Sequence, residues 1–222
     1  MFHLMQVIFL CFFLIFPAGA LALTVAIDAG HGGFETGIVQ PPNNSNESFI
    51  PEKELNLQIA VETVKALAEK GIKSYLTRDS DRFMRISERA YAAQAKKPSL
   101  FISIHTSAGR GFNIYTSIAG GDDPAGYYGP MGRQRPFIAE SERLARELEE
   151  AIKELFPGEA FFYRQMPLPL LDQIAAPAIM IEAPNPLYFN YSGGDGTKLV
   201  AAAIAAGVVS YGEGENGNAE TQ

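Results

Sequence analysis

The feature that most constrains the fold is a regular alternation between short apolar runs of strand length and longer segments with apolar residues at helical spacing. Strands that alternate with helices form βαβ units, in which the sheet is mainly parallel and helices cover both of its faces. We therefore predict an α/β fold, a single domain with a mainly parallel central sheet flanked by helices on both faces. The predicted strands span residues 23–28, 72–77, 99–105, 112–117 and 178–182, and the predicted helices span 54–70, 86–94, 138–155 and 195–211.

The first 22 residues differ sharply from the rest of the chain. They carry no Asp, Glu, Lys or Arg, and they contain an unbroken apolar run from Val7 to Phe16 that ends before the small-residue pattern Ala20-Leu21-Ala22. This run is too short to cross a bilayer comfortably and is typical of a secretory signal peptide cleaved near Ala22. Because no Lys or Arg precedes the run, a buried N-terminal element or an uncleaved anchor stays open as the alternative.

The predicted organisation is a signal peptide at 1–22, one folded domain at 23–211 and a flexible tail at 212–222. We expect the protein to be exported and to have no stable membrane span once the leader is removed. The only cysteine, Cys11, would leave with the leader, which suits an oxidising compartment. Two long segments outside the alternation, 38–51 and 119–136, are predicted to be loops.

The composition excludes several classes of protein. The chain has 25 acidic and 18 basic side chains, and a net charge of −7 argues against a nucleic-acid binder, which normally presents a basic face. A single cysteine excludes a disulfide framework and a Cys-rich zinc site. The segment that begins at Gly30 carries Glu35 where a dinucleotide fingerprint needs its third glycine. The sequence also has no Gly-x-Ser-x-Gly nucleophile elbow and no Walker A lysine.

Polar side chains cluster where the predicted strands end. His31 follows the first strand, His105 ends the third, and Glu182 ends the last. Ligands of an open α/β sheet bind at the carboxyl ends of its strands, so these side chains are expected to meet. Two histidines and a carboxylate form a common catalytic zinc set that leaves a fourth position for water. One such histidine alone would more simply be a hydrogen-bonded surface group, whereas two on the same edge favour a metal site.

Six segments of the chain resemble, in order and spacing, the type 3 family of zinc-dependent N-acetylmuramoyl-L-alanine amidases, which are peptidoglycan hydrolases. The resemblance covers nearly all of residues 24–211, which we therefore interpret as an amidase catalytic domain. The segments are AIDAGHGG (26–33), PEKELNLQIA (51–60), YLTRDSD (75–81), ISER (86–89), LFISIHTSA (100–108) and PAIMIEA (177–183).

The resemblance implies roles for four residues. His31, His105 and Glu52 match the family's zinc (Zn²⁺) ligands, and Glu182 matches its catalytic glutamate, a general base that becomes a proton donor. The implied reaction is hydrolysis of the amide between the lactyl group of muramic acid and L-alanine of the stem peptide. The residues alone leave the third ligand open among Glu35, Glu47, Glu52 and Glu54; the resemblance selects Glu52.

Three further polar residues are given lesser roles. Glu35 is expected near the site or at the surface. Asp28 is expected either to orient an imidazole or to bind the amides of the glycine turn. Arg78 is expected to pair with a carboxylate as a structural residue.

The chain departs from the family pattern after Glu182, where it reads Ala183-Pro184-Asn185-Pro186 instead of Gly-Phe, a small residue and Asn. This departure and a longer loop before Glu52 keep two other functions open: a non-catalytic wall-binding or regulatory module, and a zinc peptidase that cuts within the stem peptide. No wall-binding repeat is recognisable. The domain is expected to be a monomer that grips peptidoglycan by itself or with a protein activator.

Overall fold

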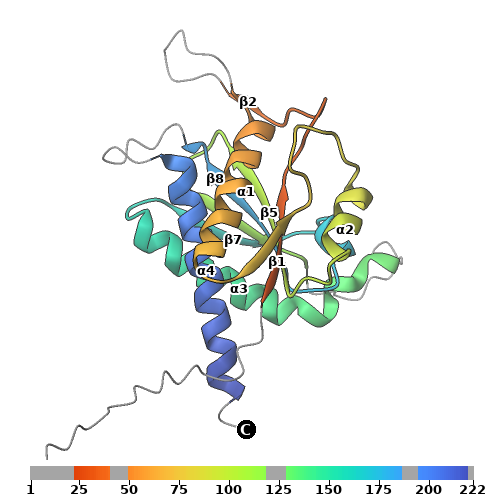
Figure 1. Ribbon diagram of the computed structural model, residues 1–222, viewed down its shortest axis with the longest axis vertical. Coiled ribbons are helices and arrows are strands. Elements are labelled where there is room, and N and C mark those ends of the chain that lie inside the picture. The colour runs from red at the N-terminus through yellow and green to blue at the C-terminus, as the bar shows by residue number, and fades with distance from the viewer. Residues whose placement is uncertain (1–22, 41–49, 119–128, 187–194, 220–222) are drawn as a thin grey trace, which may run out of the picture.

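Six strands form the central sheet of the computed structural model, which describes residues 23–40, 50–118, 129–186 and 195–219 (Figure 1). In spatial order the strands are β4 (Lys73–Leu76), β1 (Thr24–Ala29), β5 (Leu100–Ser107), β8 (Ala178–Pro184), β6 (Phe112–Thr116) and β7 (Phe161–Gln165). The helices are α1 (Glu52–Glu69), α2 (Ile86–Gln94), α3 (Ile138–Leu155) and α4 (Gly196–Ala219), with 3₁₀ segments η1 (Gly129–Phe137) and η2 (Leu171–Gln173). Two short strands, β2 (Val39–Gln40) and β3 (Ile50–Pro51), pair in an antiparallel manner before α1.

The sheet is mainly parallel, as predicted. Strands β4, β1, β5 and β8 run in one direction, so their carboxyl ends lie at one edge. Strand β6 is antiparallel to β8, and β7 is parallel to β6. Only residues 108–111 connect β5 to β6, and a parallel return needs a crossover of about a dozen residues or more. The chain therefore turns back after β5.

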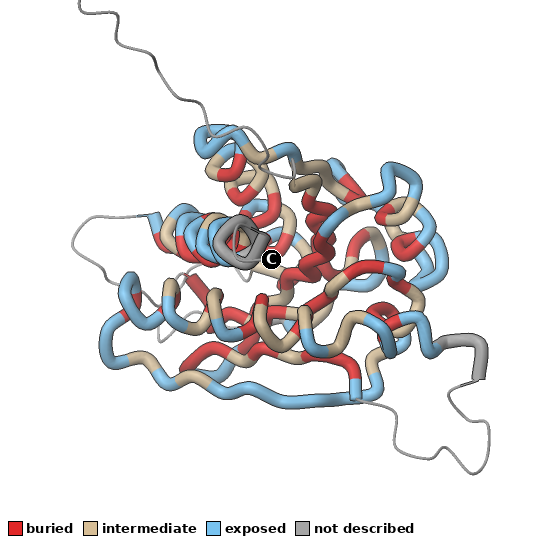
Figure 2. Tube along the Cα trace, turned by 90° about the horizontal axis from the view of Figure 1, so that it is seen from below, coloured by how far each residue is buried: buried red, intermediate tan, exposed pale blue. Residues whose placement is uncertain are grey.

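Helices cover both faces of the sheet, which confirms the predicted α/β architecture. On one face α1, α3 and α4 form a layer in which α1 and α3 both contact α4 (Figure 1). On the other face α2 contacts β1 and η2. Successive side chains of β5 point to opposite faces of the sheet and so pack into both helical layers. Ile102 and Ile104 belong to the larger core cluster, and Phe101 belongs to the smaller one. The buried residues accordingly run through the middle of the molecule (Figure 2).

The secondary structure differs from the sequence prediction in helix α1 and in strand β7. Helix α1 begins at Glu52 rather than at residue 54, and the residues it buries include Leu55 and Ile59. Because α1 packs against both the sheet and α4, its apolar stripe is wide and the sequence does not reveal its centre. Strand β7 was not predicted, since it is an edge strand whose residues after Phe161 are exposed and show no alternation.

The C-terminal helix is longer than predicted. Helix α4 extends to Ala219, eight residues beyond the predicted helix boundary at Tyr211. The tail predicted from residue 212 therefore begins within this helix, and its flexibility stays a prediction. The prediction ended the helix where apolar periodicity stops, but a segment without proline can continue a helix beyond that point. No helix in the described part of the chain is long and apolar enough to cross a membrane. The predicted signal peptide lies outside the described residues.

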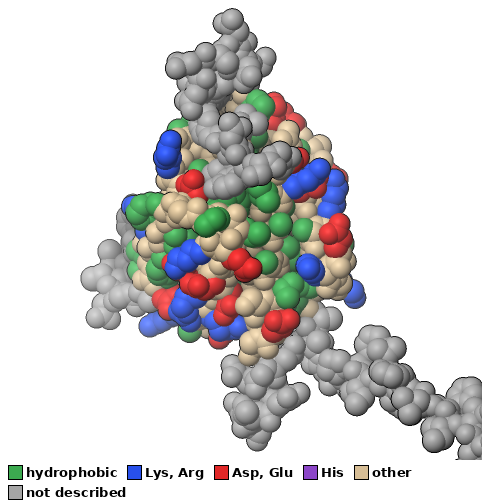
Figure 3. Space-filling model, turned by 90° about the vertical axis from the view of Figure 1, so that its left-hand side faces the viewer, with side chains coloured by type: hydrophobic (Ala, Val, Ile, Leu, Met, Phe, Trp, Pro, Cys, Tyr) green, Lys and Arg blue, Asp and Glu red, His purple; other side chains and the backbone are tan. Residues whose placement is uncertain are grey.

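The surface carries both signs of charge. On the face shown in Figure 3, acidic and basic side chains are interspersed around a central group of hydrophobic ones. Neither sign forms a continuous field on the visible, described part of this face. Recognition of a ligand there would depend on local contacts more than on long-range attraction.

A buried carboxylate, Asp28, ties α2 to the sheet. Arg89 of α2 donates from Nε and Nη2 to its two oxygens, while the hydroxyls of Thr77 and Ser103 donate at 2.6 and 2.8 Å. Both roles expected for Asp28 were therefore wrong: its side chain binds neither an imidazole nor the turn amides, because it points to the α2 face. Burial alone would raise the pKa of Asp28, but the charge and hydrogen bonds of Arg89 and the two hydroxyls hold that pKa below its usual value.

Asp28 should make the free energy of unfolding depend on pH in the acidic range. The unfolded carboxyl takes a proton near pH ~4 and the folded one at lower pH, so the free energy of unfolding should fall as the pH drops through that window. Asp28→Asn should lose about 3–5 kcal/mol at pH 7, because it leaves a buried guanidinium unpaired. Below pH ~4 the free energy of unfolding of the variant should also change less steeply with pH than that of the wild type. Urea titrations at several pH values measure the loss of stability and its pH dependence. Equal slopes of unfolding free energy against pH for wild type and variant would contradict the expectation.

Candidate metal centre

His31 lies in the glycine turn that follows β1. The amide of Gly30 donates to the carbonyl of Ile104 at 2.9 Å, which anchors the turn beside β5. His31 itself has φ +61°, in the left-handed region that residues other than glycine rarely adopt. Gly32 has φ +136°, and a Cβ there would collide with the carbonyl oxygen of Arg82. The glycines that flank His31 are therefore what this sharp turn requires, whereas His31 is held there against its backbone preference.

Glu52 is the first residue of α1, and its carboxylate is 5% exposed. Three donors from separate segments hold it: the amide of Ile38 at 2.9 Å, the amide of Thr106 at 3.3 Å and the side chain of Asn56 at 3.2 Å. The helix N-terminus also favours a negative charge. Burial alone would raise the pKa of Glu52, but hydrogen bonds to His105 and His31 dominate and hold it well below its usual range.

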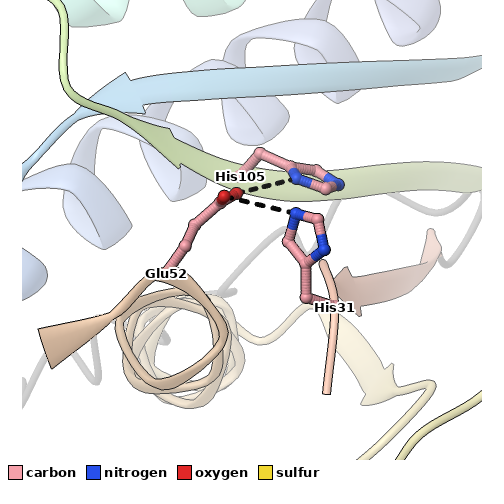
Figure 4. A group of neighbouring side chains, drawn as sticks. All are labelled: His31, Glu52 and His105. Carbon is pink, nitrogen blue, oxygen red and sulfur yellow. Dashed lines mark hydrogen bonds and ion pairs between the residues drawn. The ribbon is translucent and has the colours of Figure 1, made fainter. Parts of the chain in front are cut away.

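The structure brings His31, Glu52 and His105 together (Figure 4). Glu52 Oε1 lies 2.9 Å from Nδ1 of His105, and Oε2 lies 3.2 Å from Nε2 of His31. The two imidazoles meet edge to face, with ring centroids 4.9 Å apart. One ligand atom from each residue falls within 4.8 Å of the others. The three side chains come from the β1 turn, α1 and β5, so only the tertiary fold assembles them.

This donor set fits a zinc ion. Nε2 of His105 is buried and has no hydrogen-bond partner within the described residues, so a potential ligand atom is left for another group. Two imidazole nitrogens and a carboxylate oxygen are typical of catalytic zinc sites with an open fourth position. The same N/O set can bind other first-row divalent metals, which differ in affinity and geometry.

Glu182 lies beside this group on the neighbouring strand. The β5–β8 register pairs His105 with Glu182, so both side chains leave the sheet on the same face. Tyr115 of β6 donates its hydroxyl to Glu182 Oε2 at 3.0 Å. Burial and this hydrogen bond raise the pKa of Tyr115, so the phenol stays a donor at neutral pH. Sequence reasoning missed Tyr115, because only the antiparallel β6–β8 register places it near Glu182.

The remaining candidate carboxylates are not part of this group. Glu35 and Glu54 are exposed, and Glu47 lies outside the described residues. Asn56 was also missed; its spacing four residues after Glu52 on one helix was the available signal.

The expectation for Arg78 was wrong in its partner. Its guanidinium donates to carbonyl oxygens rather than to a carboxylate, because it lies beneath the turn where backbone acceptors converge. Arg78 also donates to the carbonyl of Ser80 at 3.2 Å.

All four residues of the segment that departs from the family pattern, 183–186, are buried. Ala183 and Pro184 extend β8 and pair with Thr106 and Ser107 of β5. The amide of Asn185 donates to the carbonyl of Ser107 at 3.1 Å. The strand that carries Glu182 therefore continues into this segment.

Comparison with known proteins assigns the family. The sheet carries a His-Glu-His group that could hold a metal ion at the carboxyl edge of its parallel strands, where ligands of α/β sheets bind. The chain belongs to the N-acetylmuramoyl-L-alanine amidase family Amidase_3, whose model matches residues 25–209. The family predicted from the six sequence segments is thereby confirmed.

Relatives and solved structures are consistent with this assignment. The uncharacterized protein YqiI of Bacillus subtilis is 38% identical over 86 residues, which are 39% of this chain and 38% of that protein. The N-acetylmuramoyl-L-alanine amidase LytC of the same organism is 26% identical over 196 residues, which are 85% of this chain and 35% of LytC. The chain thus spans little more than a third of either relative. A crystal structure of an N-acetylmuramoyl-L-alanine amidase from Clostridium difficile 630 aligns with a TM-score of 0.65 at 25% identity, covering 86% of this chain and 96% of that one.

Gly30 should be needed for metal binding. A Cβ at residue 30 would lie 2.5 Å from Nε2 of His105, so Gly30→Ala must displace that imidazole. We expect zinc affinity, measured by competition with a chromophoric chelator, to fall by about tenfold or more. Gly109→Ala is the matched control, because its Cβ would meet its nearest atom, Ser107 Oγ, at an ordinary 3.6 Å. Equal affinities for the two variants would contradict the assigned geometry.

Proposed function

We propose that this chain is an exported zinc amidase that hydrolyses the amide between N-acetylmuramic acid and L-alanine of peptidoglycan. The observation that carries the proposal is the meeting of His31, Glu52 and His105 within 4.8 Å in a chain of the amidase family. The position of Glu182, in register with His105, supports a second catalytic group beside the metal ligands. Export rests on the leader pattern of residues 1–22.

The metal would be held by His31, Glu52 and His105. Zinc bound there supplies Lewis acidity, which lowers the pKa of a water molecule and polarises a carbonyl group. The protein's own part is to keep these three ligands in place. The amides of Ile38 and Thr106 hold the Glu52 carboxylate, and the helix N-terminus favours its charge.

Glu182 would carry the proton through the reaction. Its carboxylate accepts a proton from the water whose oxygen attacks the lactyl carbonyl carbon. When the carbon–nitrogen bond breaks, Glu182 returns that proton to the amine of L-alanine. The products are a lactyl carboxylate on the sugar strand and a stem peptide with a free amino terminus. Tyr115 would keep the carboxylate in one orientation through its hydroxyl.

Digestion of purified peptidoglycan tests the reaction. The zinc-loaded protein should release stem peptides that begin with free L-alanine and leave intact sugar strands, as read by mass spectrometry. Glu182→Gln should lower kcat by about 10²–10⁴-fold, because the amide cannot accept the proton. Glu35→Gln, at an exposed carboxylate four positions after His31, is the matched control and should retain wild-type kcat.

Other products would favour the other functions. Cleavage within the stem peptide would identify a peptidase, and zinc binding without cleavage would favour a wall-binding or regulatory module. Full activity of Glu182→Gln would refute the proton-transfer role while leaving the amidase activity in place. Recovery of the protein from the cell envelope with an amino terminus near Leu23 would support export.

Tyr115→Phe should show whether Tyr115 orients the Glu182 carboxylate or contributes to substrate binding. The substitution removes one hydrogen bond to Glu182 and keeps the ring in the sheet. We expect kcat to fall by about tenfold with little change in KM, since a hydrogen bond to a charged group is worth about 1.5–3 kcal/mol. Steady-state kinetics on a soluble muropeptide measure both constants. A loss confined to KM would contradict an orienting role.

A further inference from the structure

We propose that Arg78 is a positioning residue for the metal centre. One buried guanidinium joins the turn that carries His31 to the first helical turn that carries Glu52, so two of the three ligands are set before a metal binds. The inference rests on the proposed metal-dependent function and adds a residue to it. Arg78 itself touches none of the three ligand side chains by any of its hydrogen bonds.

The contacts of Arg78 define the connection. The side chain follows β4 and is 1% exposed, so its charge is held by the protein rather than by water. Two of its acceptors directly precede His31, and another directly follows Glu52. The four accepting carbonyls are those of Ala29 (from Nε, 3.0 Å), Gly30 (from Nη2, 2.8 Å), Lys53 (from Nη2, 2.8 Å) and Ser80 (from Nη1, 3.2 Å).

The turn needs such a restraint. His31 occupies a left-handed conformation that is unfavourable for a residue with a Cβ, and such conformations persist only when the surroundings enforce them. The carbonyls of Ala29 and Gly30 both accept from the guanidinium, which fixes the two peptide planes that lead into His31. Their orientation sets the direction in which the imidazole leaves the backbone.

A second tether holds the other side of the turn. Asp81 accepts from the amide of Gly33 at 2.7 Å, and Lys53 donates to the carbonyl of Gly33 at 2.8 Å. Lys53 and Asp81 also form an ion pair at 2.5 Å. Asp81 is 48% exposed, so water screens this tether more than it screens the buried bonds of Arg78. Of these two tethers, the one through Arg78 is therefore the better shielded from water.

A lysine cannot reproduce this geometry. The planar guanidinium presents its donors in a rigid fork, and at Arg78 the fork spans carbonyls of three separate segments. An ammonium group keeps the charge but is a compact donor at the end of a flexible chain. Arg78→Lys therefore removes the connection and retains the buried charge.

Arg89 offers a matched control. It is also a buried arginine, and it also bonds to a residue of β1, but its hydrogen bonds go to Asp28 and Ser103 on the α2 face. Like Arg78→Lys, the substitution Arg89→Lys removes the planar set of guanidinium donors and keeps the positive charge. It should weaken the fold without disturbing the ligand-bearing turn.

The test measures metal affinity in the full chain, apart from any activity. We expect Arg78→Lys to bind zinc about tenfold more weakly than wild type or worse, in competition with a chromophoric chelator. Arg89→Lys should stay within about twofold of wild type, because its site is not shared with the ligands. The absorption bands of the cobalt-substituted protein should change in Arg78→Lys and remain in Arg89→Lys. Urea denaturation without metal records the stability of each variant.

Each outcome decides the question. Wild-type affinity in Arg78→Lys, or equal losses in both variants, would overturn the proposal. Arg78→Gln is the second variant, and failure of both Arg78 variants to fold without zinc would show a folding role and overturn positioning. A wild type that binds no zinc would overturn the proposal with the metal site. A wild type that binds zinc and cuts no peptidoglycan would refute only the proposed function.

Discussion

The carboxylate of Glu52 connects more of the site than any other group. One oxygen meets His105 and the amide of Thr106 on β5, and the other meets His31 and the amide of Ile38. A buried charge is stable only when donors surround it, so the loop before α1, the glycine turn and the end of β5 must all converge on this one residue. The side chain of Asn56 and the N-terminus of α1 stabilise the charge further.

Two buried arginines stabilise different segments near this edge of the sheet. Arg89 neutralises Asp28 and holds α2 against β1, which is a matter of the fold. Arg78 donates to backbone carbonyls and holds the segments that present the ligands. The two residues lie on the segments TRD and ISER, which the family resemblance brought out together, yet their partners differ completely. Two motifs that indicate the same family can thus carry arginines with different structural roles.

Much of the architecture was predictable because apolar spacing reports burial directly. Helix α2 and the parallel strands were predicted to within about two residues, and histidines at strand ends indicated a shared edge. The failures have a common cause. Edge strand β7 buries little, the centre of α1's apolar stripe depends on α4, and the partners of Asp28 and Arg78 depend on which side of the turn each side chain faces. None of these is encoded in local spacing.

The sequence by itself determined the fold class, the family and the few side chains able to bind a metal. It could do so because periodicity and rare residue types are local properties of the chain. Only the tertiary structure decided that Glu52 lies between His31 and His105, and that Tyr115 bonds to Glu182. These contacts join residues from 21 to 74 positions apart. Distances of a few ångströms between such residues are set by strand register and helix placement, which no single segment specifies.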